Sequence, residues 1–340
     1  MYYLRSSFPD HTPSYFACPV SGLKLARAFW TQMGKPMIAA KYPQYAGCIA
    51  AGLVGHGSEC YGFDDAYSQD HDFGPRFCLW LTDEDYAAIG EQLEADYEAL
   101  PRKFSVDAQG RVTFEAHARS DASGAFPSAG ADSTVIPDAA NAPTPGTATD
   151  DAATAESGAA SSDVAEAMTT PIDAPLFPVT PRAQGANRRD GVFRIGDFFE
   201  SITGYRTAPA QTAPHEWLML QESTLAAATN GEVFADPTGL FSKTRQGFKN
   251  MPDDVRLALI SKRLGMIAQA GQYNLPRSLK RGDGAAAWLS IHEFVQATAS
   301  LVFLVNVPMV VGYMPYYKWQ FAALRKLSGS MFALLPNVGE

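Results

Sequence analysis

The sequence has few cysteines, no long apolar run and little basic charge. These three features argue against a zinc-cluster protein, a membrane-spanning protein and a nucleic-acid-binding protein, respectively. All four cysteines lie in the first quarter of the chain and none is in a Cys-x-x-Cys pair, so we expect reduced thiols and no zinc cluster. The longest apolar stretch, residues 297–314, is interrupted by Asn306 and Pro308, which favours a buried helix pair over a membrane span. The N-terminus has no charged segment followed by an apolar run, so we expect no signal peptide.

Acidic residues exceed basic ones, 36 against 27, and the net charge is −9. A chain of this sign is poorly suited to nucleic acid or to an anionic membrane, although a local basic pocket for a nucleotide is compatible with it. We therefore expect a cytoplasmic protein with neither partner. Its 340 residues, 46% of them hydrophobic, suffice for one large or two medium domains.

Hydrophobic periodicity divides the first third of the chain into alternating helices and strands. Apolar residues recur at three- and four-residue spacing over 20–41, which predicts a helix with Ser21 as its N-cap. Residues 45–54 suit a buried strand or a short helix leading into one. Phe73, Phe77, Leu79 and Leu81 alternate, which predicts a strand over 71–81, and a helix capped by Asp83 follows to about residue 100.

The composition changes between residues 117 and 187, where small and polar residues dominate. Such a segment cannot bury enough apolar surface to offset its chain entropy, so we expect a disordered insertion within one domain. Strands are then predicted at 191–195 and 231–236, and helices from Asp197 and over 217–228, 253–270, 284–307 and 313–328. The expected fold class is α+β: an α/β domain of residues 20–116 and 188–240 with a small mixed sheet and flanking helices, followed by a C-terminal helical bundle of residues 250–330.

The most informative motif is a pair of carboxylates, Asp70 and Asp72, that follows Gly57 and Ser58 by a short interval. In an extended strand Asp70 and Asp72 point to the same face, where they would repel each other unless they are solvated, share a proton or bind a divalent cation. A Gly-Ser turn can bring backbone N–H groups and a hydroxyl close to a phosphate. Together these residues indicate metal-assisted phosphoryl or nucleotidyl transfer.

The same residues resemble the nucleotidyltransferase superfamily (polymerase-beta-like fold), in which Gly-Gly or Gly-Ser precedes Asp-x-Asp or Asp-x-Glu on a strand. The run of Gly57-Ser58-Glu59, Asp70-His71-Asp72 and Gly74-Pro75-Arg76 is similar to a bacterial family of unknown function within that superfamily. The resemblance covers residues 20–104 and 190–328, including the segments 231–236 and 316–319.

The resemblance implies a Mg²⁺-dependent enzyme that transfers NMP from a nucleoside triphosphate to an unidentified small-molecule or protein hydroxyl. Asp70 and Asp72 would hold the metal and be catalytic, and Gly57 and Ser58 would bind the phosphates. Further nucleotide contacts are expected from Ser68, Arg76 and Lys318. The alternatives are that Ser68 positions Asp70, that Arg76 pairs with the two carboxylates, and that Lys318 is a lysine on a packed helix with its ammonium in solvent. His71 points away from the carboxylates in a strand and is expected to be a packed histidine.

A third carboxylate, which such enzymes usually place on a later strand, is not identified by the sequence. Glu115, Asp190 and Asp236 are candidates with imperfect contexts. Without a third carboxylate, the alternative is a catalytically inactive nucleotide-binding or regulatory module with the same fold. A metal-dependent hydrolase fits the carboxylates but not the Gly-Ser spacing. A serine-hydrolase elbow at Ser58 is excluded, because His56 stands where Gly-x-Ser-x-Gly needs glycine.

Overall fold

The computed structural model describes residues 18–69, 72–115, 176–177 and 180–334. At residues 176, 186 and 328–334 it describes the backbone only. Asp70 and His71 therefore lie outside the described residues, as does most of the predicted insertion. The α+β class is confirmed, with a mixed sheet, flanking helices and C-terminal helices. The described residues form the strands β1 (Ala50–Leu53), β2 (Cys78–Leu81), β3 (Phe104–Val106), β4 (Val112–Phe114), β5 (Leu176–Phe177), β6 (Gly191–Arg194) and β7 (Glu232–Ala235).

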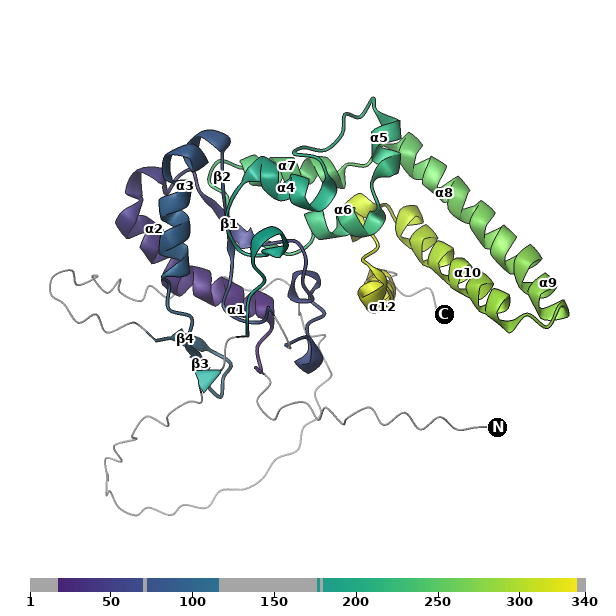
Figure 1. Cartoon of the computed structure of the whole chain (residues 1–340), viewed down its shortest axis with the longest axis horizontal. Coiled ribbons are helices and arrows are strands. Elements are labelled where there is room, and N and C mark those ends of the chain that lie inside the picture. Colours follow the sequence, from purple (N-terminus) through teal and green to yellow (C-terminus); the bar gives the residue numbers. More distant parts are fainter. Residues whose placement is uncertain (1–17, 70–71, 116–175, 178–179, 335–340) are drawn as a thin grey trace, which may run out of the picture. The chain divides into compact units, whose positions relative to one another are not determined.

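Helices make up most of the rest of the described chain (Figure 1). The helix predicted over 20–41 is interrupted by a π-helical turn at Trp30–Gly34. A second π-helical stretch, Ala268–Asn274, links two later helices. The helices are α1 (Gly22–Phe29), α2 (Lys35–Lys41), α3 (Asp83–Glu98), α4 (Ile195–Thr203), α5 (Pro214–Met219), α6 (Glu222–Thr229), α7 (Leu240–Lys249), α8 (Asp253–Ile267), α9 (Leu275–Lys280), α10 (Gly284–Val305), α11 (Pro308–Val311) and α12 (Tyr317–Leu334).

The central sheet has the strand order β6-β2-β1-β7 and mixes the two pairing directions. β1 is antiparallel to both β2 and β7, whereas β2 and β6 run parallel, with Cys78 opposite Gly191. A second, antiparallel sheet has the order β4-β3-β5. Because β5 consists of residues 176–177, the predicted insertion ends earlier than residue 187, and its last part pairs with the folded domain.

Both faces of the central sheet are buried, which explains the nearly continuous apolar sequence of β2. Leu79 and Leu81 face one core, shared with α1, α2 and α3, while Cys78 and Trp80 face the other, shared with α4, α6 and α7. Trp80 stacks on Phe241 of α7 with ring centroids 3.7 Å apart. The sheet is therefore a fixed platform, and the loops at its ends are held in place by two independent cores.

Several predicted boundaries are wrong, three of them for clear local reasons. The strand predicted over 71–81 begins only at Cys78, because Asp72 has φ 55° and Gly74 has φ 152°, neither of which continues a strand. Helix α3 is capped by Thr82, whose hydroxyl accepts from the Asp85 N–H at 3.1 Å, so Asp83 is its first residue and not its cap. The helix predicted over 217–228 is two helices, α5 and α6, separated near Leu220.

Gly231 is a position at which the fold requires glycine. Its φ is 65°, its N–H donates to the Cys60 carbonyl at 2.8 Å, and an added Cβ would lie 2.1 Å from the Leu53 carbonyl oxygen. We expect Gly231→Ala to lower the free energy of unfolding by about 3 kcal/mol or more, from backbone strain plus the clash with β1. Gly282→Ala is the control, because Gly282 has φ 71° with nothing within 4 Å of the added Cβ and should cost only about 1–2 kcal/mol. Urea midpoints of the two variants measure the difference, and equal midpoints would contradict the clash.

Candidate functional site

A cavity of about 360 Å³ gathers most of the residues that the sequence singles out. Gly57, Ser58, Ser68, Asp72, Arg76 and Lys318 all line it. They come from the loops around β1 and β2 and from the start of α12, more than 240 residues apart along the chain. Asp70 lies outside the described residues, so its predicted pairing with Asp72 stays a prediction.

The loop after β1 forms one wall, and glycines shape it. Gly55 and Gly57 have φ 117° and 140°, which let the chain turn sharply before the helical turn Glu59–Tyr61. Asn230 fixes this loop: its side chain accepts from the Gly55 N–H at 2.9 Å and donates to the Gly55 carbonyl at 2.8 Å. Ser58 is buried, and its hydroxyl has no hydrogen bond to any described residue. The wall therefore presents a fixed turn and a hydroxyl available to a ligand.

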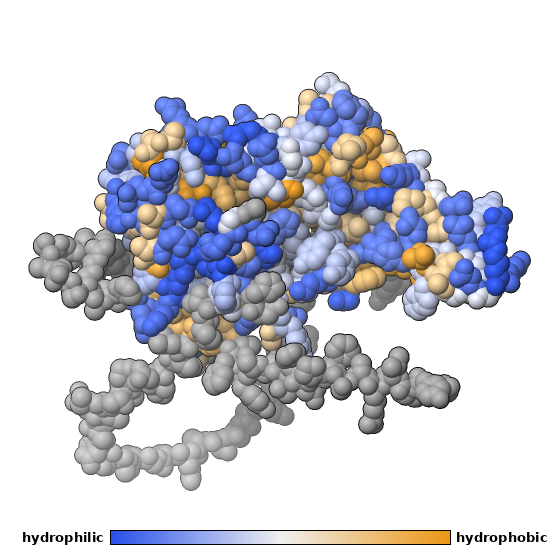
Figure 2. Space-filling model, in the orientation of Figure 1, coloured by the Kyte–Doolittle hydropathy of each residue, from blue (hydrophilic) through white to orange (hydrophobic). Residues whose placement is uncertain are grey.

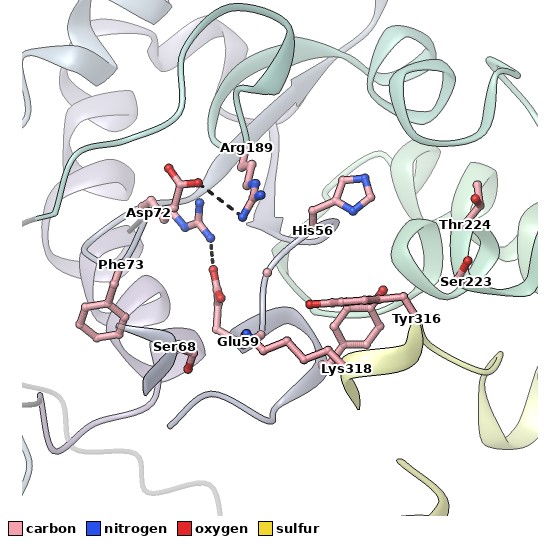
Figure 3. Close-up of a pocket in the computed structure, with 14 residues that line it drawn as sticks. His56, Glu59, Ser68, Asp72, Phe73, Arg189, Ser223, Thr224, Tyr316 and Lys318 are labelled. Atoms are coloured by element: carbon pink, nitrogen blue, oxygen red, sulfur yellow. Dashed lines mark hydrogen bonds and ion pairs between the residues drawn. The ribbon is translucent and has the colours of Figure 1, made fainter. Parts of the chain in front are cut away.

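Asp72 lies in the loop that precedes β2, with its carboxylate directed into the cavity wall (Figure 3). It is only 5% exposed. Its carboxylate accepts from the Ala183 N–H and forms an ion pair with the Arg189 guanidinium at 3.4 Å, while its own N–H donates to the Pro181 carbonyl at 3.1 Å. Segment 180–183 therefore holds the Asp72 loop in place through these hydrogen bonds. The strand geometry predicted for Asp72 is wrong, but its position at a polar cavity is shown.

Arg76 is buried, and its ion-pair partner is Glu59. Arg76 is 3% exposed, and its guanidinium donates to the Glu59 carboxylate. Burial alone would lower the pKa of Arg76, but Glu59 more than compensates, so the pKa of the guanidinium is raised. Nη1 of Arg76 is buried without a hydrogen-bond partner in the described structure. Arg76 therefore stays charged, and its contact with a phosphate stays a prediction.

Ser68 and Lys318 both line the cavity, but only the Ser68 side chain is already hydrogen-bonded within the described structure. The Ser68 hydroxyl is occupied by a capping box, accepting from the Asp65 N–H at 2.7 Å and donating to the Asp65 carbonyl at 2.9 Å. Lys318 has no carboxylate partner among the described residues, and its ammonium lies 5.0 Å from the Trp319 ring. Lys318 is thus the more available of the two for a ligand.

Sequence reasoning missed Arg189, Ser223 and Thr224, which complete the cavity from distant segments. Arg189 comes from the turn before β6, and Ser223 and Thr224 come from the first turn of α6 (Figure 3). Tyr316, from the segment 316–319 that the resemblance includes, also lines the cavity. The hydroxyls of Ser223 and Thr224 have no hydrogen bond to other described residues. Arg189 and the buried position lower the pKa of His56, burial being the larger cause, so the imidazole is neutral at pH 7. For Arg189 the local signal is the basic pair Arg188-Arg189 before a predicted strand.

None of the three candidates for a third carboxylate lines this cavity. Asp190 is 1% exposed and is occupied by the Tyr97 hydroxyl at 2.5 Å and by Arg182 at 2.8 Å. Asp236 accepts from the Ser242 N–H at 2.7 Å at the start of α7, and Glu115 follows β4. Over the ranges that the structure describes, no group of three or more Asp, Glu, His or Cys side chains is placed to hold a metal.

The comparison with protein families gave one match. Residues 217–320 match a family described as a domain of unknown function (DUF4037). This segment includes Ser223, Thr224, Tyr316 and Lys318, and it begins well after the Gly57–Arg76 run. No curated protein and no solved structure gave a match.

Proposed function

We propose that the protein is a Mg²⁺-dependent nucleotidyltransferase that moves NMP from a nucleoside triphosphate to a small-molecule or protein hydroxyl. The observation that carries the proposal is the convergence of Gly57-Ser58, Asp72 and Lys318 on one cavity. The order of elements also supports it, because a Gly-Ser turn follows β1 and β2 lies between an antiparallel and a parallel neighbour. This is the small mixed sheet that the resemblance to nucleotidyltransferases implies. The Asp-x-Asp motif departs from the family pattern, because Asp72 lies in the loop before β2 and not on the strand.

The charge and chemistry of the cavity favour a phosphate-bearing ligand. Three cations, Arg76, Arg189 and Lys318, face two carboxylates, Glu59 and Asp72, in a chain whose net charge is −9. The hydroxyls of Ser58, Ser223 and Thr224 also line the cavity without a hydrogen bond to another described residue, and Gly57 of the glycine turn lines it as well. Cationic side chains, hydroxyls and backbone N–H groups are the donors that bind phosphate oxygens.

Magnesium would be held by Asp70 and Asp72, and it would neutralise charge on the triphosphate. The described part of this donor set is Asp72, whose carboxylate lies at the cavity and now pairs with Arg189. The chain's own residues position the triphosphate: Gly57, Ser58 and Lys318 bind its oxygens. The acceptor hydroxyl then forms the new bond to the α-phosphorus in line with the departing pyrophosphate.

A catalytically inactive nucleotide-binding module is the second candidate, and one observation favours it. Asp72 is already satisfied by Arg189 and by the Ala183 N–H, which is the arrangement of a structural carboxylate. A protein of this kind would bind a nucleotide through Ser58 and Lys318 without turning it over.

The test separates binding from turnover. Each of the four NTPs is added with and without Mg²⁺, and the melting temperature and pyrophosphate release are measured, with a clarified cell extract as the source of acceptors. A transferase should show a Mg²⁺-dependent rise in melting temperature together with release of pyrophosphate. Stabilisation without release would favour the inactive module, and no stabilisation by any NTP would overturn both.

Lys318→Ala is expected to raise the KM for the nucleotide about 10-fold or more with a smaller change in kcat. The reason is that an ammonium at the cavity, with no carboxylate partner among the described residues, contributes about 1.5–3 kcal/mol when it bonds to a charged phosphate. Lys326→Ala is the matched control, because Lys326 lies on the same helix outside the cavity lining. Steady-state pyrophosphate release measures both, and an unchanged KM for Lys318→Ala would show that this lysine only packs on Trp319.

A further inference from the structure

The loop after β1 is held at two points by the residues that precede β7. Because β1 and β7 are antiparallel neighbours, the chain leaving β1 lies against the chain entering β7. The Asn230 side chain forms two hydrogen bonds with the backbone of Gly55, and the Gly231 N–H donates to the Cys60 carbonyl at 2.8 Å. These two contacts lie on either side of residues 57–59, so they fix both ends of that segment.

Between these two points, the 57–59 segment has backbone donors that the described residues do not use. The N–H groups of Gly57, Ser58 and Glu59 donate no hydrogen bond to another described residue. All three residues line the cavity of about 360 Å³. Consecutive N–H groups at a glycine turn are suited to bind an anion, because their dipoles converge on one point. The segment can therefore bind a phosphate, provided that its backbone keeps this shape.

Arg245 of α7 holds the residues that hold the loop. Its guanidinium donates to the carbonyls of Thr229 at 2.8 Å, of Asn230, and of Gly231 at 3.3 Å. The carbonyls at the end of a helix need partners, and Gly231, with φ 65°, has the conformation of a residue that often supplies one through its N–H. Here that N–H bonds to the β1 loop instead, and Arg245 binds the carbonyls. Arg245 therefore sets the position of the backbone from which Asn230 reaches Gly55.

The surroundings of Arg245 are unusual for a charged side chain. Most charged residues stay at the surface, and Figure 2 shows hydrophilic residues over much of the visible face. Arg245 is partly buried, its Nε has no hydrogen-bond partner in the described structure, and burial lowers the pKa of its guanidinium. It has no carboxylate partner among the described residues, so the stabilising contacts of this cation go to the one turn that holds the cavity loop.

We propose that Asn230 and Arg245 are positioning residues for phosphate binding: Asn230 keeps the 57–59 segment in its anion-binding shape, and Arg245 keeps Asn230 in place. Neither residue lines the cavity, so each acts through the backbone of the loop and not by touching the ligand. The ligand is the polyphosphate of a nucleotide, and this part of the inference rests on the proposed function. The part that concerns the shape of the loop is tested without any ligand.

The first measurement is amide hydrogen exchange at Gly55 in the full chain, followed by NMR. Asn230→Ala removes both side-chain bonds to Gly55 without backbone strain, since Asn230 has φ −82°, and should speed exchange at least 10-fold. Arg245→Met should speed it less, because the Asn230 side chain is still present. Lys243→Met is the control: it removes an exposed charge from the same helix and should leave the exchange unchanged.

The second measurement is calorimetric binding of inorganic tripolyphosphate, at a temperature where circular dichroism shows every variant folded. Asn230→Ala should weaken binding at least 10-fold, and Arg245→Met about 3-fold or more, whereas a purely structural role would leave the affinity of the folded protein unchanged. The double variant should bind no more weakly than Asn230→Ala alone, because Arg245 acts through Asn230, while independent effects would add. With NTP and Mg²⁺, the KM should rise by a larger factor than kcat falls.

The two measurements separate the ways in which the inference can fail. Unchanged exchange at Gly55 in Asn230→Ala would overturn the positioning role. Faster exchange with unchanged tripolyphosphate affinity would overturn the link to phosphate binding and leave Asn230 and Arg245 as structural residues of the loop. A double variant that is much weaker than Asn230→Ala would show that Arg245 does not act through Asn230. A wild-type chain that binds neither tripolyphosphate nor any NTP would overturn the proposed function and, with it, the ligand assigned here.

Discussion

Replacing Asp72 by asparagine should reduce Mg²⁺-dependent pyrophosphate release by about 1,000-fold or more, which corresponds to about 4 kcal/mol of transition-state stabilisation. Asp72 is the described member of the predicted metal-binding pair, and the triphosphate charge is left uncompensated without its carboxylate. Asparagine suits the test because it has the same shape and tolerates the φ of 55° at this position. It also keeps an oxygen that accepts from the Ala183 N–H.

The comparison variant is Asp253→Asn, at a carboxylate whose side chain is 82% exposed on α8, and its release rate should equal that of wild type. Nucleotide binding is measured in parallel by thermal shift, because an inactive but folded Asp72→Asn protein should keep part of its binding through Lys318 and Ser58. Pyrophosphate release that is unaffected by Asp72→Asn would remove Asp72 from the mechanism and leave it as the structural partner of Arg189.

Elements with a strong local pattern could be predicted from the sequence, and the central sheet is the clearest case. The apolar run that ends at Leu81 marks β2, and Ser21 caps α1 as expected, accepting from the Lys24 N–H at 3.4 Å. The sequence also contains the reason why β2 does not begin earlier, because Gly74-Pro75 lies just before it and does not continue a strand. What hydrophobic alternation could not reveal is that Asp72 adopts a positive φ, since this depends on its contacts with segment 180–183.

The cavity could be predicted only in part, because its walls come from segments that are distant along the chain. Gly57, Ser58 and Asp72 share a motif, and a resemblance to a family brought Lys318 to the same site. Arg189, by contrast, lies two residues beyond the segment 117–187, whose small and polar composition predicted disorder. Thr180, in that segment, bonds to both the N–H and the carbonyl of Phe73, at 2.7 and 2.8 Å. Composition alone does not reveal that a low-complexity segment ends in residues that pin a functional loop.

The largest effect on folding is expected from Glu59→Gln, which should lower the free energy of unfolding by about 3–5 kcal/mol. Arg76 is 3% exposed, and the Glu59 carboxylate is its ion-pair partner in the described structure. Removing that carboxylate leaves a guanidinium buried and uncompensated, and breaking one side of a buried pair typically costs this much. Arg27, whose guanidinium is exposed and pairs with Glu232, offers a control: Glu232→Gln should cost less than about 1 kcal/mol. Urea unfolding of the two variants measures the difference.

The double variant Glu59→Gln, Arg76→Met separates the structural role of Arg76 from a role in nucleotide binding. Replacing both charges by neutral side chains of similar volume should recover most of the lost stability, because the buried charge is removed along with its partner. If Arg76 also binds a phosphate, as the sequence predicts, the refolded double variant should bind NTP at least 10-fold more weakly than wild type. Its buried Nη1, which has no partner in the described structure, is the donor that such a phosphate would engage. Wild-type affinity in a stable double variant would show that Arg76 serves only to neutralise Glu59, and the anion-binding side of the cavity would then consist of Arg189 and Lys318.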